Sequence, residues 1–269
     1  MTTDAHGLRG RTALVAGASG GINLAVAERL GELGVRVAII SRDEDRISAA
    51  ATGLRARGIE AQGHTGDVRD PEAMQHIAAG VAAKWGPLDI VVSGAAGNFF
   101  APAASISSNG FRTVIEIDLI GTFNVLSAAW PHLRKPGAAI VNISAPQAQR
   151  AMSQQAHVCS AKAGVDMLTR CLALEWGSEG VRVNAVSPGP VADTEGLARL
   201  ATDGQLKDRI LASLALPRFG LRSDIAEAVA WLCSDAASFV TGTILDCDGG
   251  MRLGNFHTPS AGQVEGREQ

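Results

Sequence analysis

A glycine-rich stretch near the N-terminus, VAGASGGIN over residues 15–23, has the composition of a phosphate-binding turn. Gly17 and Gly21 let the backbone pass close to a phosphate, while Ser19 and Gly20 complete the tight turn. The stretch follows an apolar strand pattern and leads into an amphipathic helix pattern. Because the N-terminal amides of such a helix face a pyrophosphate, this context predicts a dinucleotide site.

The residues after the second predicted strand indicate which dinucleotide binds. The stretch IISRDEDR over residues 39–46 places Ser41 and then Arg42 at the strand end. An NAD-selective site would carry a carboxylate there for the ribose hydroxyls, whereas Arg42 can pair with a 2′-phosphate. We therefore predict NADP(H); the alternative is that Arg42 only covers a solvated loop. Asp67, in GDVRD, is expected at the end of the third strand near the adenine.

The apolar pattern predicts the elements that position these residues. Short runs rich in Val and Ile alternate with longer helical patterns, which is typical of a parallel sheet buried on both faces. We predict an α/β fold: a single doubly wound Rossmann-type domain over residues 1–255, with a polar tail over 256–269. The expected strands are 12–17, 35–40, 59–64, 88–94, 138–144, 181–189 and 243–250. The expected helices are 21–33, 44–57, 71–85, 105–130, 154–177, 194–213 and 223–234.

The composition favours a small-molecule partner. Of the 269 residues 46% are hydrophobic and 19% charged, the net charge is −3, and the Lys and Arg residues are spread singly. This pattern does not favour a nucleic-acid partner. The four cysteines are far apart and have no metal-binding spacing, which predicts free thiols and no metal site. Since we find no signal-peptide pattern, no apolar run of membrane-spanning length and no C-terminal Ser-Lys-Leu, we expect a soluble cytoplasmic protein.

With these features in order, the sequence resembles the short-chain dehydrogenase/reductases over about residues 8–253. The matching features are the glycine-rich turn, SGAAGN over 93–98, Lys162 on its helix, SPGPVADT over 187–194 and DGG over 248–250. The resemblance implies that Pro188, Gly189 and Val191 line the nicotinamide side, and that Thr194 reaches the cofactor amide or phosphate. It also implies a homotetramer formed through the helices at 105–130 and 154–177 and the last strand.

The full set of predicted cofactor-binding residues combines both lines of reasoning. It consists of Gly17, Ser19, Gly20, Gly21, Ile22, Arg42, Asp67, Val68, Ala95, Lys162, Pro188, Gly189, Val191 and Thr194. One position departs from the family pattern, because typical members carry a third glycine where this chain has Asn23. We expect this difference to alter helix packing or the approach of the phosphate.

The family's usual catalytic residues are Asn, Ser, Tyr and Lys, and this chain keeps only Lys162. The Asn position is Asp118, the Ser position is Ala145 and the Tyr position is Val158; the chain contains no Tyr. Ser144 precedes Ala145, but strand side chains alternate, so it is expected to point the other way. Ketone reduction needs a proton donor to oxygen, and neither Val158 nor Ala145 can be one.

Hydride addition to a conjugated dienoyl thioester makes a different demand, because it gives a dienolate whose proton finally goes to carbon. A Lys and a carboxylate that hold a water could meet that demand. The sequence resembles 2,4-dienoyl-CoA reductases of the peroxisomal type in AAGNF (95–99), DLIGTFNV (118–125), HVCSAKAGVDMLTRCLALEWG (157–177) and PGPVADTEGL (188–197). The resemblance implies NADPH-dependent reduction of a 2,4-dienoyl-CoA to a 3-enoyl-CoA in fatty acid oxidation.

In this hypothesis Lys162 holds the nicotinamide ribose and supplies positive charge, while Asp118 orients Lys162 or a water. Asn98 donates to the thioester carbonyl, Phe99 with Phe100 lines an acyl pocket, and Arg150 meets the CoA phosphates.

Less specific interpretations stay open. Arg150 is equally expected as a solvated residue at the rim of the site, and Phe99 can be explained by packing within its loop. Asp166 is expected to pair with Lys162 along the helix. His157 is expected as a loop or rim residue. Residues 194–213 are expected to form a substrate lid. Rival functions are a 3-oxoacyl-type carbonyl reductase and a catalytically silent dinucleotide-binding member.

Overall fold

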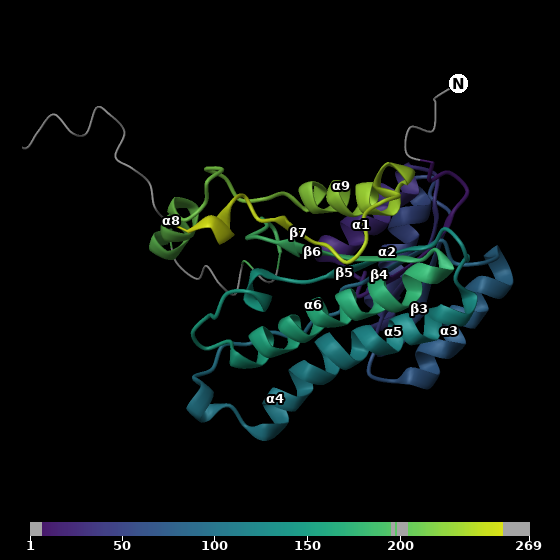
Figure 1. Cartoon of the computed structure of the whole chain (residues 1–269). Coiled ribbons are helices and arrows are strands. Elements are labelled where there is room, and N and C mark those ends of the chain that lie inside the picture. Colours follow the sequence, from purple (N-terminus) through teal and green to yellow (C-terminus); the bar gives the residue numbers. More distant parts are fainter. Residues whose placement is uncertain (1–6, 195–196, 198–203, 255–269) are drawn as a thin grey trace, which may run out of the picture.

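A seven-stranded parallel sheet forms the centre of the molecule, in the order β3-β2-β1-β4-β5-β6-β7 (Figure 1). The computed structural model describes residues 7–194, 197 and 204–254. The strands are β1 (Thr12–Ala16), β2 (Arg36–Ser41), β3 (Ala61–Thr65), β4 (Ile90–Ser93), β5 (Ala139–Ile143), β6 (Arg182–Pro188) and β7 (Ile244–Cys247). All seven predicted strands are confirmed. The strand order reverses between β1 and β4, and open α/β sheets bind ligands at the carboxyl ends beside such a point.

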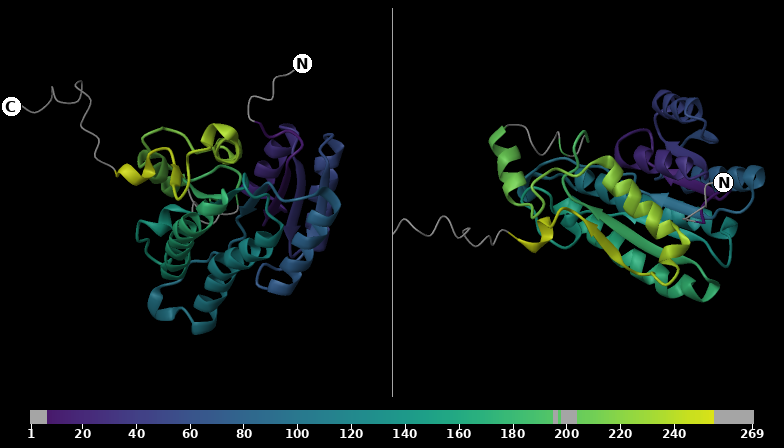
Figure 2. Two further views of the ribbon diagram at one scale, coloured as in Figure 1. Left: turned by 45° about the vertical axis from the view of Figure 1, so that its right-hand side comes forward. Right: turned by 90° about the horizontal axis from the view of Figure 1, so that it is seen from above.

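Helices cover both faces of the sheet, which confirms the doubly wound architecture. The helices are α1 (Gly21–Glu32), α2 (Glu44–Ala56), α3 (Pro71–Trp85), α4 (Ser108–Ile115), α5 (Gly121–Ala129), α6 (Ala156–Trp176), α8 (Gly204–Ala212) and α9 (Arg222–Cys233). Apolar residues of α1, α2 and α9 form one core layer and those of α3, α5 and α6 form the other. The view from above in Figure 2 shows α9 lying along β6 and β7.

The long helix expected over 105–130 is present as one continuous helical run, but it contains a π turn. It begins at Ser108, where the Ser107 side chain accepts from the Gly110 amide, and α4 then passes into a π-helical turn over Glu116–Ile120 before α5. A π turn inserts an extra residue and redirects side chains, and such turns are frequent at functional sites. Asp118 lies in the middle of this turn.

The continuous run over Ser108–His132 is long and apolar enough to cross a membrane by length and composition. Half of its most apolar window is buried inside the protein, against α3 and α6. A core helix of a soluble protein meets the same criterion, so the run does not indicate a membrane span.

Part of the predicted lid lies outside the described residues. Within 194–213 the structure describes Thr194, Leu197 and the segment 204–213, which contains α8. The predicted tail over 256–269 lies entirely outside them.

Candidate active site

Lys162 and Asp118 form a buried ion pair at the carboxyl ends of the central strands. Lys162 Nζ lies 3.3 Å from Asp118 Oδ2 and donates to the Ile143 carbonyl at 3.0 Å. The Gly97 amide donates to Asp118 Oδ1 at 2.7 Å. Asp118 is fully buried and Lys162 nearly so, and Asp118 Oδ2 has no hydrogen-bond donor among the described residues. The pair therefore holds a carboxylate oxygen that can accept from a water beside a fixed ammonium.

The two positions that would carry hydroxyl donors are occupied by other contacts. Val158 is buried in an apolar cluster with Val114 and Ala161. Ser144, beside Ala145, donates its hydroxyl to Asp166 on α6. Neither position offers a proton to a substrate oxygen.

Asp166 holds the end of β5 against α6. It accepts a hydrogen bond from Ser144 across the layer, while Lys162, one turn earlier on the helix, acts on it through its charge. The expected helix pair is therefore electrostatic, and Lys162 forms its ion pair with Asp118. Burial raises the pKa of the Asp166 carboxyl above its ordinary value, against the lowering effects of the Ser144 hydroxyl and nearby cations.

His157 is not a rim residue, which corrects the expectation from sequence. It lies in the first turn of α6, is fully buried, and packs against Phe99 in a tilted arrangement with ring centroids 4.2 Å apart. Neither ring nitrogen has a hydrogen-bond partner among the described residues. The physical reason is that α6 begins at Ala156. His157 is therefore part of the helix, and its side chain faces the loop after β4.

The predicted substrate residues lie in loops around the ion pair. Asn98 Oδ1 accepts from Gln155 Nε2 at 3.0 Å, and Phe99 and Phe100 are 37% and 40% exposed. Arg150 is exposed and its guanidinium donates to the Met251 carbonyl at 3.3 Å. It therefore holds the C-terminal segment after β7 and lies at the rim.

Sequence reasoning missed Gln147 and Gln155. Gln147 Nε2 donates to Gln155 Oε1 at 3.0 Å, and Gln155 Nε2 in turn donates to Asn98 Oδ1. The signal was the concentration of glutamines in PQAQRAMSQQ, between β5 and α6.

The glycine-rich turn has the close approach that a dinucleotide cradle needs. Gly17 has φ 76°, and a Cβ there would lie 2.7 Å from the Ala95 backbone nitrogen, so only glycine fits. Helix α1 begins at Gly21 with no acidic residue in its first turn, which leaves its N-terminal amides suited to an anion. The residues present therefore fit a dinucleotide.

Polar and basic groups gather where β1 and β2 end. The Ser41 hydroxyl lies 3.1 Å from the Ser19 hydroxyl, and Arg42 follows as an exposed side chain. Arg46, which sequence reasoning did not select, reaches from α2 to within 3.4 Å of the position a Cβ would take on Gly20. The signal was its place in the first turn of α2, four residues after Arg42.

The remaining predicted cofactor residues lie along the same edge of the sheet. The hydrogen bond from Arg69 lowers the pKa of Asp67, and Val68 packs on Gly121. A Cβ on Gly189 would lie 2.6 Å from the Asp248 Cα. Thr194 Oγ1 donates to the Val191 carbonyl at 2.8 Å, so this hydroxyl shapes the loop after β6. Ile22 and Pro188 also lie at this edge, at the start of α1 and at the end of β6.

The family described as Enoyl-(Acyl carrier protein) reductase has a sequence model that matches residues 17–252. The chain belongs to the short-chain dehydrogenase/reductase family. As a member of this family it is an oxidoreductase with a nicotinamide dinucleotide cofactor.

Individual members of this family are similar to this protein over most of its length. The Peroxisomal 2,4-dienoyl-CoA reductase [(3E)-enoyl-CoA-producing] of Arabidopsis thaliana is 39% identical, with 91% of this chain and 86% of that protein covered. The protein of the same name from Danio rerio is 41% identical, with 91% and 83% covered. A short chain dehydrogenase from Bacillus anthracis has a solved structure with a TM-score of 0.83 and 31% identity, covering 93% of this chain and all of that one.

Asn23 departs from the usual short-chain dehydrogenase/reductase glycine, and the structure shows how it is accommodated. Its Nδ2 donates to the Gly94 carbonyl at 2.9 Å and contacts the carbonyls of Ala16 and Gly17 at 3.3 Å. A Cβ on Gly94 would lie 2.5 Å from the Asn23 amide. The side chain at position 23 therefore fills space that a glycine at position 94 leaves open, and ties the phosphate turn to the end of β4.

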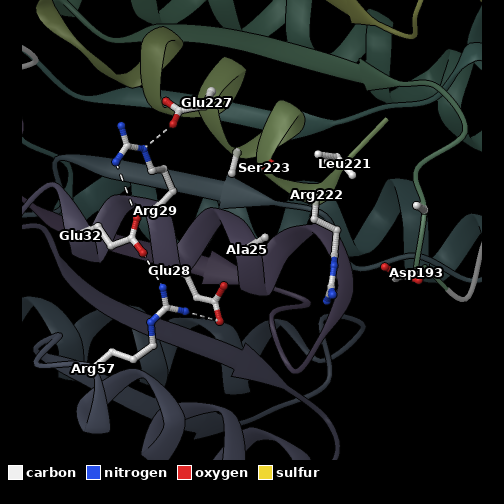
Figure 3. Close-up of a pocket in the computed structure, with 12 residues that line it drawn as sticks. Ala25, Glu28, Arg29, Glu32, Arg57, Asp193, Leu221, Arg222, Ser223 and Glu227 are labelled. Carbon is white, nitrogen blue, oxygen red and sulfur yellow. Dashed lines mark hydrogen bonds and ion pairs between the residues drawn. The ribbon is translucent and has the colours of Figure 1, made fainter. Parts of the chain in front are cut away.

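A cavity of about 500 Å³ lies between α1 and α9 and reaches Ala192 and Asp193 in the loop after β6 (Figure 3). Arg29 pairs with Glu227 across it, and Arg57 pairs with Glu28 and Glu32 on α1. These exposed pairs link three helices, which is a structural role.

Proposed function

We propose that the chain is an NADPH-dependent reductase that converts a 2,4-dienoyl-CoA to a 3-enoyl-CoA. The observation that carries this proposal is the buried Lys162–Asp118 pair in a site where Ala145 and Val158 supply no hydroxyl. Such a site suits a reaction whose proton goes to carbon. The names of the Arabidopsis and Danio relatives support the substrate class.

When bound, NADPH supplies the hydride. Lys162 is placed to hold the nicotinamide ribose hydroxyls, since its ammonium is fixed by the Ile143 carbonyl and by Asp118. Asp118 Oδ2 accepts from a water, and the adjacent ammonium makes that water a better acid. Asn98 Nδ2 donates to the thioester oxygen, and Phe99 and Phe100 give the acyl chain an apolar wall.

The preference for NADPH rests on the basic groups after β2. Arg42 and Arg46 flank the end of β1 and β2, where a 2′-phosphate would lie, and Ser41 stands where NAD-selective sites carry a carboxylate. Two guanidinium groups can pair with a phosphate through several charge-assisted hydrogen bonds.

One assay tests the function. Purified protein is mixed with NADPH and either a 2,4-dienoyl-CoA or a 3-oxoacyl-CoA, and NADPH loss is followed. Consumption only with the dienoyl thioester supports the proposal, and mass analysis then tells a 3-enoyl from a 2-enoyl product after hydrolysis and derivatisation. Consumption with the oxo compound supports a carbonyl reductase, and NADPH binding without turnover supports a silent member.

We also propose a homotetramer that covers the outer face of the long helices. Large apolar side chains are exposed on these helices, namely Ile120 and Phe123 on the run over 108–132 and Met167 and Leu174 on α6, the last 85% exposed. Light scattering at several concentrations tests the oligomeric state. A cytoplasmic location stays a prediction that cell fractionation checks.

A further inference from the structure

Three amide side chains form a directional hydrogen-bond chain that ends at the substrate loop. Gln147, in the turn after β5, donates to Gln155, and Gln155 donates to Asn98 in the loop after β4, each at 3.0 Å. Gln155 is fully buried at the start of α6. A chain of amides oriented in one sense joins the three segments that surround the ion pair.

The backbone around this chain is held in place on both sides. The Ala101 amide donates to the Gln154 carbonyl at 3.1 Å, and Gln154 has a φ of 64°, which is unusual for a residue with a side chain. The Gly97 amide is fixed on Asp118. The loop over residues 97–101 therefore has anchors at its beginning, at Asn98 and at its end.

The direction of the chain decides which end of Asn98 faces a ligand. Because Gln155 donates, Asn98 uses its oxygen within the protein. Its Nδ2 carries two N–H bonds, so one can reach a ligand oxygen even while the other keeps a protein partner. Amides that donate in sequence polarise one another, which strengthens the last donor.

We propose that Gln155 and Gln147 are positioning residues that fix Asn98 as the hydrogen-bond donor to the thioester oxygen. This inference rests on the proposed dienoyl-CoA reduction. The hydride forms the new C5–H bond, the π electrons shift toward the thioester oxygen, and Asn98 Nδ2 stabilises the charge that develops there. The proton that completes the product goes from the water beside Asp118 to C2. No proton moves along the amide chain.

The experiment is a double-mutant cycle on kcat with a 2,4-dienoyl-CoA. Removal of one donor to a developing oxyanion lowers kcat by about 100- to 1,000-fold in known enzymes, and this is the loss expected for Asn98→Ala. Gln155→Met keeps the length of the side chain but removes both amide groups, so Asn98 loses its orientation and kcat should fall about 10- to 100-fold. In the Asn98→Ala background, Gln155→Met should have no further effect on kcat.

Two further variants separate positioning from folding. Gln155→Glu keeps the acceptor for Gln147 but cannot donate when ionised, so it should turn the Asn98 amide around and lower kcat as much as Gln155→Met. Gln62→Met, on the edge strand β3, is a matched control that should keep wild-type kcat. NADPH affinity should stay within about twofold in all of them, since a merely local fold defect near the cofactor would change it.

The outcomes are distinct. Wild-type kcat in Gln155→Met and Gln155→Glu, or losses that add to that of Asn98→Ala, would overturn the amide chain while leaving the dienoyl-CoA reaction in place. A wild-type protein that oxidises no NADPH with 2,4-dienoyl-CoA would remove the proposed function and this inference together.

Discussion

The Asn23–Gly94 contact leads to a prediction about the phosphate turn. Gly94→Ala would place a Cβ 2.5 Å from both terminal atoms of the Asn23 amide, closer than real Cβ contacts. The amide would have to give up its bond to the part-buried Gly94 carbonyl. Asn23→Gly restores the residue typical of the family and removes the obstacle.

The magnitudes follow from these contacts. Overpacking of this kind costs about 1–3 kcal/mol, the range we expect for Gly94→Ala. Asn23→Gly loses the two hydrogen bonds that Nδ2 can make at once, about 1 kcal/mol each, but also removes Oδ1, which is buried without a partner among the described residues. The net loss should be about 1 kcal/mol. In the double variant the methyl group enters vacated space, so the cost of Gly94→Ala should disappear.

Urea unfolding of the wild type, both single variants and the double variant measures this coupling. We expect the double variant to be about as stable as Asn23→Gly, which corresponds to a coupling of at least about 1 kcal/mol. NADPH affinity should fall in Gly94→Ala, because Asn23 also contacts the Gly17 carbonyl. Free energies of unfolding that add within about 0.5 kcal/mol would refute the steric exchange.

The remaining predictions concern the ion pair, the cofactor and a buried carboxyl. Lys162→Ala should lose most turnover, and Asp118→Ala should give a slow enzyme that still binds NADPH. Steady-state rates and NADPH titration measure both effects. Full activity in either variant would exclude that residue from the mechanism. Replacing Arg42 and Arg46 together by Ala should weaken NADPH binding by about 10- to 100-fold, because one or more charge-assisted hydrogen bonds to the 2′-phosphate are lost. NADH binding should stay nearly unchanged. Equal losses of affinity for both cofactors would contradict the assignment. Asp166→Asn should gain stability relative to the wild type as the pH rises. A carboxyl with a raised folded pKa contributes stability that is fully present below its ordinary pKa of 3.8 and is lost as the pH rises through the folded pKa. Unfolding at about pH 4 and about pH 8 measures the difference, and a constant difference would contradict it.

The sheet could be predicted because its strands are continuous apolar runs, and apolar runs of that kind have few other stable arrangements. Even β3, whose burial alternates, was found at the edge of the sheet. The π turn at Asp118 could not be predicted, because it depends on packing between α4, α5 and α6 that no local residue pattern encodes. The predicted single helix over 105–130 therefore missed the feature that directs Asp118 to Lys162.

Side-chain contacts between distant segments were the hardest part of the site to predict. His157 has the polarity of a surface residue, yet α6 carries it under Phe99. Gln155 lies only seven residues before Lys162, but its partner Asn98 is 57 residues away in the chain. Sequence spacing shows which residues share an element, whereas such partners become visible only once strand order is fixed.

The pattern of neighbours around the altered catalytic positions favours a changed chemistry over a decayed site. A site that had only lost its tyrosine would leave its former partners unpaired. Here Val158 is packed by Val114 and Ala161, and Asp118 is bonded by the Gly97 amide and paired with Lys162. The unsatisfied group that remains in the pair is Asp118 Oδ2, an acceptor for a water placed beside an ammonium. A reductase that delivers its proton to carbon needs such an acceptor to hold a water. In a catalytically silent dinucleotide-binding protein, a buried carboxylate oxygen without a partner would bring only a cost in stability.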